Sequence, residues 1–142
     1  MALGCCRIRT VGHALLRLKV ALVRATGAWY ANGVLFMTSF VETPTFTRSV
    51  IRHLGEDEYR ALQLALLLHP DQGRVIEGSA GLRKMRWGSA ARGKRGGLRL
   101  IYYWSRREDV CYMLYLYTKN EQGDLTTAQL RILVRIVREE CK

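Results

Sequence analysis

The alternation of apolar and polar positions changes period near Gly73, and this change separates two groups of predicted elements. After Gly73, apolar residues recur at every second position, which is typical of half-buried strands. The pattern predicts four successive strands, at residues 74–77, 81–87, 97–104 and 110–118. Since consecutive strands with short connections most simply pair with their neighbours, we expect an antiparallel meander.

Before Gly73 the pattern predicts one strand and two helices. The strand covers residues 39–42, and a helical stretch around residues 47–53 follows Pro44. The second helix has acidic residues 56–58 at its N-terminus, an apolar body at 59–68, and a stop at His69 and Pro70. Its apolar residues nearly encircle it, which predicts burial against a sheet.

A last helix is predicted to begin at Thr126 or Thr127, because Thr126 and Gln129 have the spacing of a capping box. Its apolar residues form a stripe, and its arginines lie away from that stripe on a face expected to be solvated. The stripe comprises Leu130, Leu133, Val134 and Val137, and the arginines are Arg131, Arg135 and Arg138. Together these elements predict an α+β domain with a C-terminal helix.

Strand alternation also predicts which side chains share a face. Lys84 and Arg86 point to one side of their strand, whereas Met85 and Trp87 point to the other, which suggests a wet face and a core face. On the next strand Arg99 interrupts a run of Leu, Ile and Tyr. Tyr115, Tyr117 and Lys119 share one parity on the last strand and its continuation.

The charge distribution indicates a polyanionic partner. The chain has 23 Lys and Arg against 12 Asp and Glu, a formal net charge of +11 on 142 residues. Residues 82–107 contain nine Lys or Arg and no acidic residue, and they combine Gly with aromatic residues. This composition favours RNA over a small neutral ligand.

Cysteine usage points to a reducing compartment. Cys5 and Cys6 are adjacent, Cys111 lies in an apolar run, and Cys141 is penultimate. No pair has the spacing of a zinc site or a redox motif, so the cytoplasm fits better than secretion.

The first 36 residues differ from the rest in composition. They contain five basic residues and no acidic one, whereas all 12 acids follow Met37. One interpretation is a targeting or membrane-surface segment, because residues 11–23 are amphipathic and carry arginine. The interpretation we favour is that Met37 is the true start, so that residues 1–36 are a basic N-terminal extension with a mis-assigned start, ahead of a domain at residues 37–142.

Several short motifs occur in this domain in a characteristic order. They are Phe40-Val41-Glu42, Asp57-Glu58-Tyr59-Arg60, Gly81-Leu82-Arg83-Lys84, Gly93-Lys94-Arg95-Gly96-Gly97 with Arg99 and Ile101-Tyr102-Tyr103, and Lys119-Asn120-Glu121. In order and spacing they resemble the RelE/HigB group of type II toxins, especially its HigB-2-like branch. That group consists of ribosome-dependent mRNA endonucleases.

The resemblance implies a twisted antiparallel sheet packed against helices, with a positively charged face that holds mRNA in the ribosomal A site. It also implies a helix-turn-helix antitoxin as partner and cleavage without metal or cofactor. In such cleavage the ribose 2′-hydroxyl attacks the adjacent phosphorus, so the site needs a base, cations and an acid. The catalytic cations implied are Lys84, Arg86, Arg99 and Lys119. The RNA contacts expected are Arg83, Arg92, Lys94, Arg95, Tyr103 and Tyr117.

The sequence departs from the family at Asn120, where family members often have Arg. No His lies between Arg74 and Lys142, so a lysine or a tyrosine would have to act as base in that region. Arg92, Lys94 and Arg95 equally fit a solvated loop. His53 and His69 are expected at helix ends in structural roles. Two alternatives stay open: an RNA-binding module without catalysis, and a ribosome-associated regulatory protein.

Overall fold

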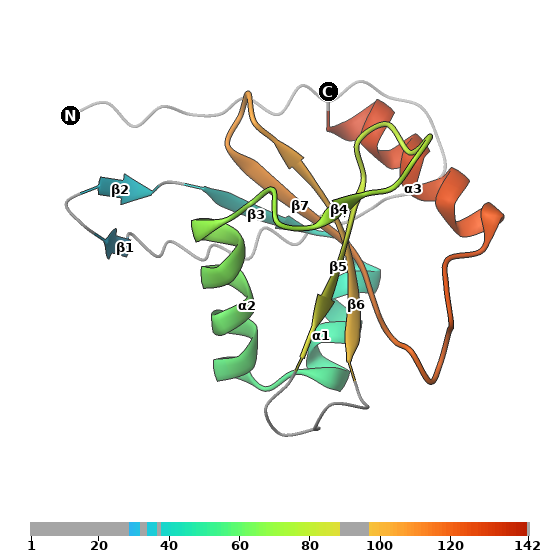
Figure 1. Cartoon of the computed structure of the whole chain (residues 1–142), viewed down its shortest axis with the longest axis horizontal. Helices are drawn as coiled ribbons and strands as arrows, with labels where there is room; N and C mark the ends of the chain where they lie inside the picture. Colours follow the sequence, from blue (N-terminus) through green and yellow to red (C-terminus); the bar gives the residue numbers. More distant parts are fainter. Residues whose placement is uncertain (1–28, 32–33, 37, 89–96, 142) are drawn as a thin grey trace.

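The computed structural model describes residues 29–31, 34–36, 38–88 and 97–141. Its main sheet has five strands in the order β3-β7-β6-β5-β4 (Figure 1). Among the described residues, no helix is long and apolar enough to cross a membrane. The strands are β3 (Ser39–Glu42), β4 (Arg74–Val75), β5 (Arg83–Trp87), β6 (Leu98–Ser105) and β7 (Val110–Thr118).

The predicted meander is confirmed, because β4, β5, β6 and β7 pair antiparallel in succession. The expectation of a wholly antiparallel sheet is wrong at one edge, where β3 runs parallel to β7 and Phe40 is opposite Cys111. A parallel pair needs a long crossover. Here two helices and three strands separate β3 from β7 along the chain.

Three helices cover the sheet: α1 (Pro44–His53), α2 (Glu56–Leu68) and α3 (Thr127–Glu140). Helix α1 begins three residues before the predicted stretch, because the Thr43 hydroxyl accepts a hydrogen bond from the Phe46 amide and Pro44 occupies the first turn. The predicted capping box of α3 is confirmed, with Thr126 as its N-cap. The α+β class and the C-terminal helix are therefore confirmed.

The sheet has two apolar faces, and different helices cover them. Met85, Leu100 and Met113 belong to a buried cluster with Phe46 of α1 and Leu62 of α2. On the other face, residues of β6 and β7 pack with the apolar stripe of α3. Figure 1 shows α1 and α2 on one side of the twisted sheet and α3 on the other. The predicted stripe is confirmed, since Leu133 and Val137 are buried and the α3 arginines are exposed.

Helix α2 is buried on one side only, although its apolar residues nearly encircle it. Leu62, Leu66 and Leu67 are buried, whereas Leu64 and Leu68 are exposed. The predicted burial of this helix against the sheet is therefore confirmed for one side of the helix. The reason is that only one long side of α2 meets the sheet.

A buried carboxylate joins β3 to the two helices that follow it, α1 and α2. Glu42 ends β3 with a side chain only 3% exposed. It accepts hydrogen bonds from the hydroxyls of Thr47 in α1, at 2.7 Å, and Tyr59 in α2. Burial raises the pKa of Tyr59, and the bond to Glu42 raises it further. The Glu42 network therefore fixes three elements relative to one another.

Residues before Met37 form one further pair of strands. Strands β1 (Trp29–Ala31) and β2 (Val34–Phe36) pair antiparallel with each other in a separate sheet. The amphipathic residues 11–23 lie outside the described part of the chain. The division at Met37 therefore stays a prediction.

Candidate nucleic-acid interface

Strand pairing brings the predicted cations of β5 and β6 together. Arg86 is opposite Arg99, and Arg99 is opposite Tyr117 of β7, so the three lie in one row across the sheet. The neighbouring row on the same face contains Lys84, Ile101 and Tyr115. Met85 points to the opposite side of β5, into the buried cluster with α1 and α2. The prediction that one side of β5 carries cations and the other faces a core is therefore confirmed.

Arg99 is less accessible than expected. Arg99 is buried, with 8% exposed, although the resemblance implies a catalytic cation at this position. The reason is its central position, because β5 and β7 flank β6 on both sides. Arg99 therefore contributes charge from within the sheet face, whereas Arg86 is exposed at its edge.

Lys84 pairs with an acidic residue that the sequence did not single out. Its Nζ donates to Oδ1 of Asp124, in the loop before α3, at 2.6 Å. The hydrogen bond from Lys84 lowers the pKa of Asp124, and the charge of Arg99 lowers it further. The residues of this contact are 40 positions apart in sequence, so no local motif indicates it.

Tyr117 lies beside this pair. It is 2% exposed, and its hydroxyl has no hydrogen-bond partner that the structure describes. Burial raises its pKa, while Lys84 and Arg99 oppose that rise electrostatically. Tyr117 therefore keeps its proton at neutral pH and does not suit the role of base.

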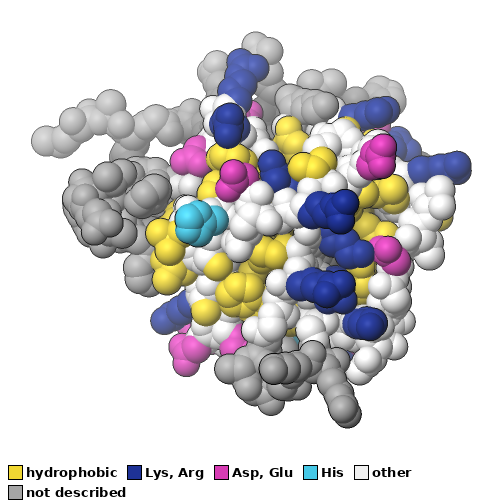
Figure 2. Space-filling model, in the orientation of Figure 1, with side chains coloured by type: hydrophobic (Ala, Val, Ile, Leu, Met, Phe, Trp, Pro, Cys, Tyr) yellow, Lys and Arg dark blue, Asp and Glu magenta, His cyan; other side chains and the backbone are white. Residues whose placement is uncertain are grey.

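A groove beside β4 and β5 offers the accessible part of the basic surface. It encloses about 800 Å³ and is lined by Lys84 and Arg86 together with Gln72, Arg74 and Glu77. Figure 2 shows several Lys and Arg side chains on the side of the molecule where Figure 1 places β5 and α3. Gln72 and Arg74 were not predicted site residues, because the register that places Arg74 opposite Lys84 is not evident in the sequence.

Arg83 and Tyr103 have contacts within the protein. Arg83 points away from Lys84, and its Nη1 donates to the carbonyl oxygens of Asp71 and Gly73 at 2.8 Å. It therefore ties the segment after α2 to β5, which does not fit its predicted RNA contact. Tyr103 is half-buried and its ring packs against Tyr112. Tyr117, also expected to contact RNA, is buried as described above.

Lys119 and Asn120 lie in an exposed turn after β7. The same turn contains Glu121, whose Oε2 lies 3.3 Å from Nε2 of His53 at the end of α1. A hydrogen bond from the Thr118 backbone lowers the pKa of Glu121, and His53 contributes to the same direction. His53 therefore contacts the turn that follows β7. The sequence did not predict this contact, because the two residues are far apart along the chain.

The remaining predicted loop cations, Arg92, Lys94 and Arg95, lie outside the described residues. Their expected contacts with RNA stay predictions.

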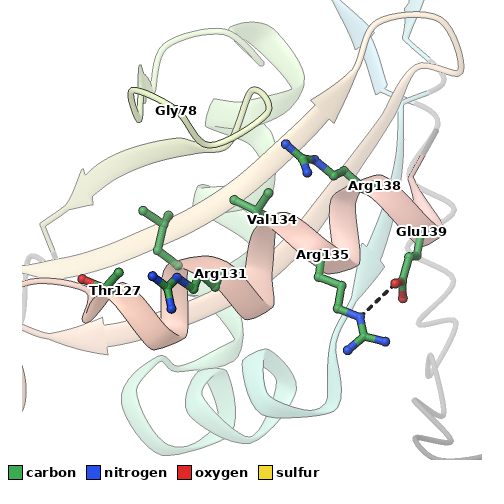
Figure 3. Close-up of a pocket in the computed structure, with 8 residues that line it drawn as sticks. Gly78, Thr127, Arg131, Val134, Arg135, Arg138 and Glu139 are labelled. Carbon is green, nitrogen blue, oxygen red and sulfur yellow. Dashed lines mark hydrogen bonds and ion pairs between the residues drawn. The ribbon is translucent and has the colours of Figure 1, made fainter.

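A second groove lies between α3 and the turn at Gly78 (Figure 3). It encloses about 400 Å³, and Leu130 and Val134 form its apolar part. Arg135 Nε donates to Glu139 Oε1 at 2.8 Å, as the dashed line in Figure 3 marks. The arginines of α3 are exposed, in agreement with the predicted solvated face.

A scan of the chain against models of known protein families finds no match.

Proposed function

We propose that this protein is the toxin of a type II toxin-antitoxin system and a ribosome-dependent endoribonuclease that cleaves mRNA. The observation that carries the proposal is the convergence of Lys84, Arg86 and Arg99 on one sheet face beside Tyr117. The groove that Lys84 and Arg86 line is open to a phosphate backbone. Two of the motifs that resemble the RelE/HigB group reach this face, since Lys84 lies on β5 and Arg99 on β6.

The proposed reaction is attack of a ribose 2′-hydroxyl on the adjacent phosphorus, with departure of the 5′-oxygen. Lys84 and Arg86 bind the phosphate oxygens from the groove, and Arg99 adds positive potential from beneath them. Charge that develops on the phosphate in the transition state is stabilised there. DNA is not a substrate, because it lacks the 2′-hydroxyl.

Proton transfer is assigned by elimination among the residues at this face. Tyr117 keeps its proton, which excludes it as the base. The ammonium of Lys84 has no lone pair, so Lys84 can take the 2′-hydroxyl proton only in its neutral form, after its own proton has passed to solvent. We propose Lys84 as the base in that form.

The proposed partners follow from the function. A toxin that cleaves mRNA acts on the ribosome in the cytoplasm and needs a neutralising antitoxin, for which the family resemblance suggests a helix-turn-helix protein. The formal charge of +11 suits both the ribosome and an acidic partner segment.

A second candidate function is RNA or ribosome binding without catalysis. Asn120, in place of a frequent Arg, and the burial of Arg99 favour it, because each reduces the positive charge available to a reacting phosphate. Binding alone needs only the exposed cations of the groove. Cleavage of mRNA separates the two candidates.

The test compares the purified wild type with Lys84→Ala and Arg135→Ala on translating ribosomes, with primer extension to detect mRNA ends. We expect the wild type to cleave, and Lys84→Ala to lose about a hundredfold in rate, as removal of one electrostatic donor typically does. Arg135→Ala removes an equal charge that already pairs with Glu139, so it should cleave normally.

Circular dichroism of all three proteins provides the folding control. Absence of cleavage by the wild type under conditions where it binds ribosomes would favour the second candidate. Equal losses in Lys84→Ala and Arg135→Ala would show that the active site lies elsewhere.

A further inference from the structure

The principal cation of the proposed site already has an anionic partner from the chain itself. Asp124 Oδ1 lies 2.6 Å from Lys84 Nζ, the distance of a charge-assisted hydrogen bond. The same oxygen accepts the Leu125 amide at 2.8 Å. A carboxylate oxygen in this position makes the contact that a phosphate oxygen would make.

Asp124 lies in a position from which it can withdraw. Its side chain is 75% exposed, whereas that of Lys84 is 28% exposed. An ion pair this open to water contributes little to stability, so its exchange for another anion costs little. The Gln122 side chain donates to the Asp124 carbonyl oxygen at 2.5 Å, so the backbone of this loop is held and only the exposed Asp124 side chain needs to turn away from Lys84.

The surrounding charges act on Asp124 and on an incoming anion alike. Arg99 helps to lower the pKa of Asp124, so its positive potential reaches this carboxylate. Tyr117 experiences Lys84, Asp124 and Arg99 together, which places all four groups in one electrostatic neighbourhood. A phosphate that replaced Asp124 would therefore gain the same interactions.

We propose that Asp124 is an internal competitor for the anion that binds Lys84, and that it makes the site selective for polyanions. A single phosphate gains at this position only the interactions that the Asp124 carboxylate already has. A nucleic-acid strand presents several phosphates, so contacts at Arg86 and Arg74 in the same groove offset the displacement. The choice of RNA as the polyanion rests on the proposed function.

The decisive variant is Asp124→Asn, which removes the charge and retains an oxygen to accept the Leu125 amide. Its binding to a 2′-O-methyl oligoribonucleotide, which cannot be cleaved by attack of a 2′-hydroxyl, is measured by fluorescence anisotropy at low salt. We expect the Kd to fall about five- to tenfold relative to the wild type. Inorganic phosphate should displace the oligonucleotide from Asp124→Asn at a lower concentration than from the wild type.

The matched control is Glu139→Gln, which makes the same change in net charge at a residue paired with Arg135 on α3. We expect its Kd to change less than twofold. If Glu139→Gln increased the affinity for the oligoribonucleotide as much as Asp124→Asn does, net charge alone would explain the effect, and the proposal would be overturned. Weaker binding by Asp124→Asn, or no binding by either the variant or the wild type, would overturn it too.

A double variant tests whether the effect passes through Lys84. In a Lys84→Gln background, Asp124→Asn should no longer improve binding, because the cation for which Asp124 competes is absent. A full gain in that background would contradict the proposal.

This experiment is independent of cleavage. If the translating ribosomes show no mRNA cleavage but Asp124→Asn binds more tightly, the proposed enzyme activity fails and the internal competition stands. If cleavage occurs and Asp124→Asn binds as the wild type does, the competition alone fails.

Discussion

Tyr117 illustrates how burial decides the chemistry available to a single residue. Its phenol lies among cations, which favour the ionised form, yet burial raises its pKa because the charged phenolate would lose water. Desolvation is the largest cause of the shift, so it outweighs the nearby charges. A basic surface therefore does not by itself supply an activated tyrosine.

The buried thiol of Cys111 predicts that the free energy of unfolding depends on pH. The residue is fully buried, and burial raises the pKa of its thiol to about 12. An unfolded thiol titrates near pH ~8.5, so above that pH the unfolded chain loses a proton that the folded chain keeps. We expect this thiol's contribution to the free energy of unfolding to be complete below pH ~8.5. Above it, the contribution should fall by about 1.4 kcal/mol per pH unit.

Urea unfolding between pH 8 and pH 10 measures this dependence. Cys141 should add a similar slope, because burial raises its pKa to about 12 as well. The control is Cys111→Ala, whose unfolding free energy should fall less steeply with pH, since it lacks one of the two buried thiols that the structure describes. An unchanged slope in Cys111→Ala would contradict the assignment to this thiol.

The direction of a single side chain was predictable where it follows from the alternation along one strand. It was not predictable where it depends on a contact with a residue far away in the sequence. The opposite directions of Lys84 and Met85 follow from strand geometry alone. The burial of Arg99 follows from its strand being central, and the Lys84–Asp124 contact from the path of a loop. Neither of those is encoded in the residues nearby.

At the scale of elements, hydrogen bonds at helix ends explain why the boundaries were predictable. Helix α3 starts where Thr126 accepts from the Gln129 amide at 3.2 Å and the Gln129 side chain accepts from the Thr126 amide at 2.9 Å. Both residues are visible in the sequence at the required spacing. The start of α1 was placed too late because its cap, Thr43, precedes a proline that also fits a turn.

Thr126→Ala should therefore destabilise the fold through α3. The substitution removes the hydroxyl that accepts the Gln129 amide, and loss of such a cap typically costs about 1 kcal/mol. The midpoint of urea unfolding, with the slope unchanged, measures this loss. Thr127→Ala is the matched control, since Thr127 is the exposed first residue of the helix and should change stability by less than ~0.5 kcal/mol. Equal losses in the two variants would show that the capping box does not stabilise α3.

At the scale of the whole molecule, one sheet separates a structural side from a basic side. Helices α1 and α2 pack on the face that contains Met85 and Met113, and the Glu42 network anchors them to β3. The other face carries the rows of Lys84 and Arg99, with α3 alongside. The meander was predictable because its connections are local, whereas the parallel edge strand β3 was not, because its partner lies about 70 residues away.

This organisation predicts that a chain beginning at Met37 folds and keeps the function of the full chain. The five-stranded sheet, the three helices and both buried clusters consist of residues 39–141. In the described part of the chain, β1 and β2 pair with each other in a separate sheet.

We therefore expect the shortened chain to unfold cooperatively, with a denaturation midpoint close to that of the full chain. The same protein should match the full chain in mRNA cleavage and in oligonucleotide affinity. Affinity at two salt concentrations serves as a second measurement, because the five basic residues before Met37 would steepen the salt dependence if they contacted RNA. Loss of the cooperative transition would show that the first 36 residues belong to the fold. A shallower salt dependence with the fold intact would instead show that they contribute to the RNA interface.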